Sequence, residues 1–210
     1  MGAESRDCLL IQFAREPVAG AVKTRMIPHL SPPEACALHA ELVLWTAATL
    51  VAARLGRVEL AVAGAAGHSL FQDCLDLGVA GLTLQRGADL GARMYNALAA
   101  GLDRFERVVL VGSDCPSIDG DYLRQALLAL DQEDIVLGPA ADGGYTLVGA
   151  RRVPREMFEG ISWGTAAVFN ETTLRLQRSG VAWSALPVLH DIDRPGDLPV
   201  WTALRATRGG

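Results

Sequence analysis

The chain has 210 residues, of which 50% are hydrophobic and 20% are charged, and its formal net charge is −5. This composition excludes an intrinsically disordered chain and a collagen-like repeat. The acidic balance disfavours nucleic acid as a partner, because nucleic-acid-binding proteins present a basic face. At about 150 residues per domain, the length predicts a single domain over residues 1–210.

Cysteine spacing and hydropathy bear on the compartment of the protein. The chain has no CxxC pair among its four cysteines, which are Cys8, Cys36, Cys74 and Cys115. Scattered thiols of this kind are typical of a reducing compartment. Residues 1–6 lack the apolar core of a signal peptide. The longest apolar run, residues 42–53, is shorter than the ~20 residues of a membrane helix. We therefore expect a cytoplasmic protein with no membrane partner.

Short apolar segments of strand composition alternate with segments of helical periodicity along the chain. Predicted strands occupy residues 8–13, 58–62, 82–85, 108–111, 135–137 and 145–148. Predicted helices occupy residues 31–55, which open with a Ser31-Pro-Pro-Glu34 capping box, and 68–77, 89–105, 123–130, 165–179 and 195–206. Residues 181–192 are predicted to be mixed extended chain. The alternation predicts a mainly parallel sheet with helices on both faces, and ligands bind such sheets at the carboxyl ends of the strands.

A basic segment with one glycine follows the first predicted strand. Gly20 permits close approach of the backbone to a ligand, and Lys23 and Arg25 flank Thr24 with two cations. Such a loop suits an anionic phosphate group, and an ordinary basic surface loop is the alternative. The segment is not a Walker A loop, because Val22 stands where that motif has glycine.

A second glycine-containing segment follows the third predicted strand. It begins at Gln85 and enters a helix that carries Arg93, with Gly87 and Gly91 between them. The glycines would let a ligand approach the helix N-terminus, where the helix dipole favours anions. A plain N-cap by Asp89 is the alternative.

Two acidic positions are candidate metal ligands. Asp114 ends the apolar fourth strand, where a carboxylate needs a cation or hydrogen-bond donors. Mg²⁺ and Mn²⁺ take oxygen ligands and bridge phosphates, so Asp114 suits such a metal, and an N-cap or Asx turn is the alternative. Asp191 and Asp193 point the same way in extended chain. Asp193 can complete a metal site with Asp114, or it can cap the helix that begins at Pro195.

Four sequence blocks occur in one order along the chain. They are Phe13-Ala-Arg-Glu-Pro-Val-Ala-Gly-Ala-Val-Lys-Thr-Arg-Met26, Gly112-Ser-Asp-Cys-Pro116, Asp142-Gly-Gly-Tyr-Thr-Leu-Val-Gly149 and Asp191-Ile-Asp-Arg-Pro-Gly-Asp-Leu198. With these blocks the chain resembles, over nearly its whole length, a bacterial family of GT-A-like transferases. That family is identified as radical-SAM/selenodomain-associated glycosyltransferases and is similar to 2-phospho-L-lactate guanylyltransferase. The resemblance implies the nucleotide-diphospho-sugar transferase (GT-A) fold, an α/β fold with a Rossmann-like, mainly parallel sheet and one antiparallel strand.

The resemblance also implies roles for matching residues. Lys23 and Arg25 match the cations that hold nucleotide phosphates, and Asp114 and Asp193 match two metal-binding aspartates. The Gly-x-Gly-x-Arg-Met-Gly loop of nucleotidyltransferases is absent, and a single Gly20 stands in its place. This departure counts against pyrophosphorylase-type chemistry.

The resulting hypothesis is a metal-dependent transferase with Mg²⁺ or Mn²⁺, a nucleotide-activated donor, foremost a nucleotide sugar, and a small acceptor. The metal, Lys23 and Arg25 would stabilise charge on the departing nucleotide. Gly20, Thr24, Gln85 and Arg93 complete the expected nucleotide contacts. Two alternatives stay open: nucleotidyl transfer with release of pyrophosphate, and a nucleotide-binding protein without catalysis.

The remaining candidates concern the acceptor. The sequence Asp142-Gly143-Gly144 is typical of a hairpin turn, and this is its first interpretation. In the functional interpretation, Asp142 orients the acceptor or acts as a base, and the two glycines and Tyr145 face the bound molecule. Trp163 precedes a predicted helix and either stacks on a ligand ring or packs within its loop.

Overall fold

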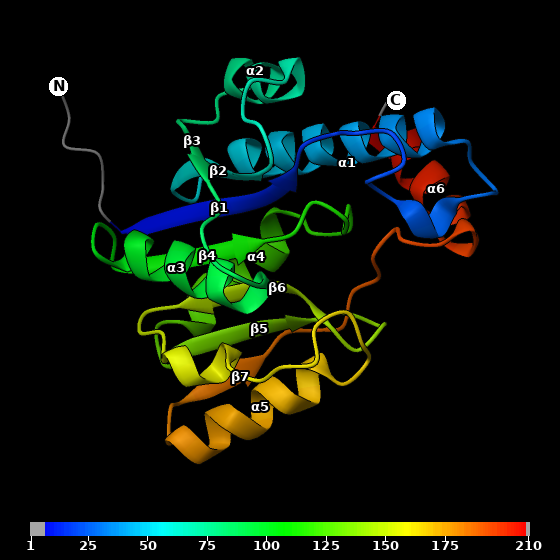
Figure 1. Cartoon of the computed structure of the whole chain (residues 1–210). Helices are drawn as coiled ribbons and strands as arrows, with labels where there is room; N and C mark the ends of the chain where they lie inside the picture. The colour runs from blue at the N-terminus through cyan, green and yellow to red at the C-terminus, as the bar shows by residue number, and fades with distance from the viewer. Residues whose placement is uncertain (1–6, 209–210) are drawn as a thin grey trace, which may run out of the picture.

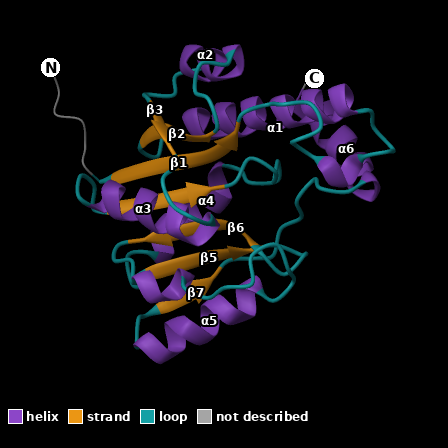
Figure 2. Cartoon of the chain, viewed as in Figure 1, coloured by secondary structure: helices purple, strands orange, loops and turns teal. Residues whose placement is uncertain are grey.

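The computed structural model describes residues 7–208, and its strands form one mixed sheet (Figure 1, Figure 2). Residues 1–6, expected to lack a signal-peptide core, lie outside the described residues. Within the described chain the strand order is β3-β2-β1-β4-β6-β5-β7. The strands are β1 (Cys8–Arg15), β2 (Arg57–Ala63), β3 (Leu82–Leu84), β4 (Arg107–Val111), β5 (Ile135–Pro139), β6 (Tyr145–Ala150) and β7 (Trp183–Ala185). β6 pairs antiparallel with β4 and β5, and the other pairs are parallel, which confirms the predicted fold class.

Helices cover both faces of the sheet (Figure 2). On one face lie α1 (Pro32–Ala53), α2 (Ser69–Asp76) and α4 (Gly120–Ala129), and on the other lie α3 (Leu90–Leu102) and α5 (Val168–Ser179). Successive residues of β1 point to opposite faces, so Leu10 joins the core under α1 while Leu9 joins the core under α3. α6 (Leu198–Arg208) packs through Trp201 on the N-terminal half of α1 (Figure 1). Three short 3₁₀ helices complete the set: η1 (Thr24–Met26), η2 (Arg155–Phe158) and η3 (Pro195–Asp197).

α1 begins with the predicted capping box. The Ser31 hydroxyl accepts from the Glu34 amide, and a Glu34 carboxylate oxygen accepts from the Ser31 amide at 2.8 Å. The helix is longer than the apolar run 42–53: it spans 22 residues with a window of mean hydropathy 1.5, enough by length and composition alone to cross a membrane. Within the protein 44% of that window is buried, and Leu42 and Leu50 are fully enclosed.

Several predicted helix boundaries differ from the structure, among them the end of α3 and the start of α5. α3 ends at Leu102, so Phe105 packs against the core from the following loop. α5 begins at Val168 and not at 165. The Thr165 hydroxyl donates to the Ser162 carbonyl at 2.8 Å, and this local bond holds the preceding residues in a turn.

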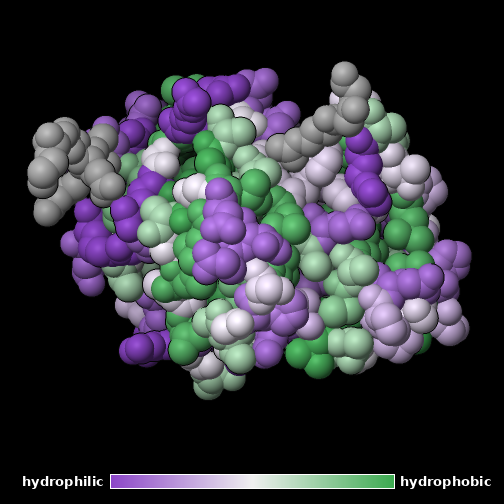
Figure 3. Space-filling model, turned by 90° about the horizontal axis from the view of Figure 1, so that it is seen from above, coloured by the Kyte–Doolittle hydropathy of each residue, from purple (hydrophilic) through white to green (hydrophobic). Residues whose placement is uncertain are grey.

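Apolar side chains are present on the surface of the protein as well as in its core. In Figure 3, hydrophobic and hydrophilic residues are interspersed over the face seen from above. Half of the chain is hydrophobic, and folded proteins ordinarily keep much apolar area on their surface.

Candidate functional site

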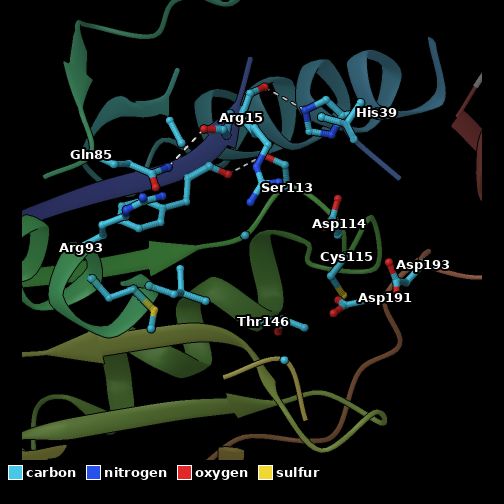
Figure 4. A pocket seen from close by; sticks show the side chains of 18 of the residues that line it. Arg15, His39, Gln85, Arg93, Ser113, Asp114, Cys115, Thr146, Asp191 and Asp193 are labelled. Atoms are coloured by element: carbon cyan, nitrogen blue, oxygen red, sulfur yellow. Dashed lines mark hydrogen bonds between the residues drawn. The ribbon is translucent and has the colours of Figure 1, made fainter. Parts of the chain in front are cut away.

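A cavity of about 670 Å³ lies at the carboxyl ends of β1, β2 and β4, beside the start of β6. Its walls come from segments far apart in the sequence: the end of β1, the loop 21–25, α1, the segment from Gln85 into α3, the turn after β4 and the C-terminal segment 191–193. Figure 4 labels side chains around the cavity from the end of β1, from α1, from the segment that begins at Gln85, from the turn after β4 and from the C-terminal segment. The sheet thus brings the predicted site segments to the edge where ligands of α/β folds bind.

The cavity collects most of the predicted nucleotide and metal residues. Those that line it are Lys23, Thr24, Arg25, Gln85, Arg93, Asp114 and Asp193, and of the predicted acceptor residues Tyr145 also lines it. Gly20 does not line the cavity, and a Cβ at this position would have no atom within 4 Å. Its φ of +82° therefore serves the turn before Lys23. The predicted contact of the Gly20 backbone with a ligand stays a prediction.

The predicted acceptor residues are more dispersed. Asp142 is exposed at the tip of the β5–β6 hairpin, outside the cavity lining, and its Oδ1 accepts from the Gly144 amide at 2.9 Å. This hydrogen bond belongs to the hairpin turn that the Asp-Gly-Gly composition predicts. Gly143 also lies outside the lining, because it serves packing: a Cβ there would stand 2.3 Å from the Ala166 carbonyl oxygen. Its φ of +90° also favours glycine.

Trp163 packs within its loop. Its ring meets Tyr145 edge-on, with centroids 6.3 Å apart and an interplanar angle of 87°. It also closes on Gly91, where a Cβ would stand 2.6 Å from Trp163 Cζ2. Gly91 therefore lets the loop tryptophan reach α3, and Trp163 is not among the residues that line the cavity.

Lys23 is buried at the centre of the site. Its side chain is 2% exposed, and its Nζ lies 2.7 Å from Asp114 Oδ1. The ammonium also donates to the Ile192 carbonyl. Lys23 has a φ of 50°, in the left-handed region that a residue with a Cβ seldom adopts. The loop after β1 is thus tied to both the turn after β4 and the C-terminal segment.

Arg25 forms a second ion pair, between the loop after β1 and the C-terminal segment. Its Nη1 lies 2.6 Å from Asp193 Oδ2, and this hydrogen bond and charge raise the pKa of Arg25. Asp193 does not cap the C-terminal helix: the Asp197 carboxylate accepts from the amides of Asp193 and Arg194 at 3.0 and 2.7 Å. The carboxylate of Asp193 is therefore available to cations at the cavity.

Asp191 faces the cavity beside Asp114, as the extended spacing of Asp191 and Asp193 predicted (Figure 4). Burial, followed by the charges of Asp114 and Asp142, raises the pKa of Asp191 to about 7. Burial and the charge of Asp191 also raise the pKa of the Cys115 thiol to about 12. Burial and the neighbouring carboxylates therefore disfavour the charged forms of both Asp191 and Cys115.

The glutamine after β3 is held in one orientation. Gln85 Nε2 donates to the Ala14 and Ala61 carbonyls at 3.1 and 2.9 Å (Figure 4). Its Oε1 is then the atom that can accept from a ligand. Asp89 is the N-cap of α3, as one of the two interpretations of this segment predicted, and its carboxylate accepts from the Ala92 amide at 2.8 Å.

Arg15 is a site residue that the sequence interpretation missed. Its exposed side chain lines the cavity from the end of β1 (Figure 4), and in the described chain it forms no ion pair. The signal was its place in the first block of the family resemblance. Arg15 and Arg93 are thus two cavity arginines without a carboxylate partner among the described residues.

His39 was missed because it sits within an otherwise apolar helix. It is 6% exposed on α1, and its Nε2 lies 2.9 Å from the Arg15 carbonyl oxygen. Burial lowers the pKa of His39, which favours the neutral ring. Its spacing from buried Ala35 and Leu42 was the available signal, since a polar residue on a buried helix face needs a partner.

A buried polar network positions the turn that carries Asp114. Gln12 Nε2, in the middle of β1, donates to the Val43 carbonyl at 3.0 Å and to Ser113 Oγ at 2.9 Å. Ser113 Oγ in turn donates to the Phe13 carbonyl at 2.8 Å. These bonds fix the residue before Asp114 against β1.

Comparison with known proteins places the fold. A protein from Desulfovibrio desulfuricans G20, described as a "putative nucleotide-diphospho-sugar transferase", is 33% identical with a TM-score of 0.83, and the match covers 94% of this chain and 86% of that chain. CMP:2-keto-3-deoxy-manno-octonic acid synthetase complexed with CTP is 11% identical with a TM-score of 0.60, covering 96% and 99%. Mycobacterium tuberculosis H37Rv Rv0371c in complex with manganese is 20% identical with a TM-score of 0.51, covering 95% and 98%.

Sequence comparison adds the family. No curated protein matches the sequence. Residues 46–165 match the bacterial family described as "Uncharacterized protein conserved in bacteria (DUF2064)", a stretch that includes Asp114 and Gln85. The chain belongs to this family and has the nucleotide-diphospho-sugar transferase fold.

Proposed function

We propose that the protein is a nucleotide-dependent transferase that binds the diphosphate of its donor in the cavity at the carboxyl edge of the sheet. The observation that carries this proposal is the convergence of Arg15, Lys23, Arg25 and Arg93 on one cavity that also presents Asp114 and Asp193. Cations of this kind suit phosphates, and the carboxylates suit a divalent metal between them. The 33% identical Desulfovibrio protein and the synthetase structure with CTP support this class.

The donor we propose first is a nucleotide sugar, transferred to a small acceptor. The name given to the Desulfovibrio protein supports this choice. In this function the arginines and Lys23 hold the diphosphate, and Gln85 Oε1 accepts from a donor group of the base. Tyr145 lies at the far wall of the cavity, toward the hairpin with Asp142, where we place the acceptor.

The residues present fit a divalent metal. Asp114 Oδ1 is a buried carboxylate oxygen to which no described donor makes an aligned hydrogen bond. In the described chain no group of three or more His, Cys, Asp or Glu side chains can hold a metal. Two carboxylates suffice for Mg²⁺ or Mn²⁺ when phosphates and water complete the shell. We propose Asp114 and Asp193 as the ligands; the metal, once bound, would neutralise charge on the diphosphate.

Isothermal titration tests the proposal. The purified protein with Mn²⁺ is titrated with UDP, GDP, CDP, ADP and TDP and then with sugar derivatives of the nucleotide that binds. We expect saturable binding of at least one nucleotide, weakened in Arg15→Met and unchanged in Arg124→Met. Arg124 is the matched control, because it lies outside the cavity lining and pairs with Asp121 on α4. Absence of binding by every nucleotide and nucleotide sugar would overturn the proposal.

Nucleotidyl transfer is the second candidate, favoured by the structural likeness to the synthetase complexed with CTP. In that reaction an acceptor oxygen attacks the α-phosphorus of a nucleoside triphosphate, and pyrophosphate leaves. A pyrophosphate-release assay with the nucleoside triphosphate of the preferred base separates the two. Glycosyl transfer releases no pyrophosphate, so its appearance with a small phosphorylated acceptor would select the second candidate.

A further inference from the structure

Two ion pairs join the proposed phosphate-binding cations to the proposed metal ligands. Lys23 Nζ lies 2.7 Å from Asp114 Oδ1, and Arg25 Nη1 lies 2.6 Å from Asp193 Oδ2. Both cations come from the loop after β1, whereas both carboxylates come from other segments. Each cation on that loop is thus neutralised by a carboxylate that the proposed function assigns to the metal.

The Lys23 ammonium and a divalent cation would compete for Asp114, because both are cations drawn to the same carboxylate. A bound Mg²⁺ lies about 2.0–2.1 Å from its carboxylate oxygens, and Lys23 Nζ already stands 2.7 Å from Asp114 Oδ1. Like charges this close repel each other, and the repulsion is only partly screened because the Lys23 side chain is 2% exposed and the Asp114 side chain is 49% exposed. The pair is also poorly aligned, because Asp114 Oδ1 makes no hydrogen bond with any described donor. The ammonium is therefore paired with that oxygen by charge, while its hydrogen bond goes to the Ile192 carbonyl.

The loop that carries the cations is partly exposed. Gly20, at a φ of +82°, would have nothing within 4 Å of a Cβ, so there is open space beside the turn. Lys23 occupies a left-handed conformation at a φ of 50° that its buried ammonium helps to hold. Residues 18–21 and 24–25 on either side of this position are exposed. Met26, which is fully buried, anchors the far end.

We propose that Lys23 and Arg25 are resident counter-ions of the metal-binding carboxylates, so that divalent metal and diphosphate bind in a coupled exchange of partners. The phosphates take Lys23 and Arg25, and the carboxylates of Asp114 and Asp193 are released to the metal. Arg15 and Arg93, which pair with no described carboxylate, are free to meet the phosphates first. This coupling rests on the proposed nucleotide function of the cavity, and it predicts that either ligand alone binds weakly.

The test is a pair of titrations with opposite expected signs. Binding of Mn²⁺ alone is measured by calorimetry, and binding of pyrophosphate alone is measured in the presence of EDTA. Lys23→Met should raise the affinity for Mn²⁺ about tenfold and lower that for pyrophosphate, since coupling between sites is typically 5–150-fold. Asp114→Asn should abolish Mn²⁺ binding and raise the affinity for pyrophosphate, because it frees Lys23.

Three further variants make the outcome decisive. Lys23→Arg keeps the charge and should leave Mn²⁺ affinity low. Arg124→Met removes an equal charge outside the cavity lining, so Mn²⁺ affinity should not change. If Lys23→Met fails to fold in a thermal melt, Arg25→Met replaces it, with a gain in Mn²⁺ affinity of about threefold, because that pair is 47% and 30% exposed.

Unchanged Mn²⁺ affinity in folded Lys23→Met would overturn the exchange. So would equal losses for Mn²⁺ and pyrophosphate, which indicate a structural role only. Failure of the nucleotide panel with the opposite shifts intact would refute the nucleotide function and leave the exchange standing. Nucleotide binding together with an unshifted Mn²⁺ affinity in Lys23→Met would support the nucleotide function and refute the exchange.

Discussion

Arg15 and Arg25 line the same cavity but should contribute unequally to nucleotide affinity. A charge-assisted hydrogen bond from Arg15 to a phosphate is worth about 1.5–3 kcal/mol, and Arg15 gives up no ion pair to make it. Arg15→Met should therefore weaken nucleotide binding about 10- to 150-fold. Arg25 must first leave Asp193, from which it stands 2.6 Å away.

An ion pair as exposed as Arg25–Asp193 is worth about 0–1 kcal/mol. That amount is subtracted from what Arg25 gains on a phosphate, so Arg25→Met should cost up to about fivefold less affinity than Arg15→Met. Calorimetry with the nucleoside diphosphate that binds best, at fixed Mn²⁺, measures both losses side by side. An equal or greater loss in Arg25→Met would refute the reasoning that Arg25 is already engaged.

Three other predictions concern stability and thiol chemistry. The pKa of Glu59 is lowered by hydrogen bonds from Arg104 and Arg57, which span 2.8–3.0 Å. A carboxyl whose pKa is lowered in the folded state stabilises the fold at pH values above its unfolded pKa, ~4.3. Glu59→Gln should therefore lower the free energy of unfolding in urea by about 1–2 kcal/mol at pH 7, and by a shrinking amount below pH ~4. A difference between the two proteins that stays constant with pH would contradict this. Gly91→Ala should destabilise by about 1–3 kcal/mol, because the new Cβ meets Trp163 Cζ2 at 2.6 Å and the Phe158 carbonyl oxygen at 2.8 Å; an unshifted unfolding midpoint would contradict that. Among the four thiols, only partly buried Cys36 should react with Ellman's reagent at pH 8 in the native state, because burial raises the pKa of Cys8 and Cys74 to about 11 and of Cys115 to about 12; rapid native reaction in Cys36→Ser would contradict it.

The sheet could be predicted because buried parallel strands are continuous apolar runs. β4 follows this rule, and β1 follows it apart from Gln12; each ends where a charged or polar turn begins. β7 could not be found in the same way, since it has only three residues, with a serine at its centre. Its position follows from pairing with β5, a contact that the local sequence does not encode.

The sequence predicts which residues of the candidate site lie at the same edge of the sheet. It does not predict which of those residues form ion pairs with one another. Lys23, Asp114 and Asp193 meet at one cavity because parallel strands bring their carboxyl ends to one edge. That Lys23 pairs with Asp114 is a tertiary choice across the sheet, which no spacing reveals. Asp142 was assigned from its neighbours in sequence, and the hairpin turn instead directs its carboxylate to the Gly144 amide.

The central claim is that the cavity at the carboxyl edge of the sheet binds a nucleotide diphosphate. A crystal structure of the protein soaked with Mn²⁺ and the best-binding nucleoside diphosphate tests it most directly. The account predicts phosphate density in contact with Arg15 and Arg93, with the metal on Asp114 and Asp193 and Lys23 displaced from Asp114. A nucleotide bound elsewhere on the protein, with the Lys23–Asp114 pair unchanged, would contradict it.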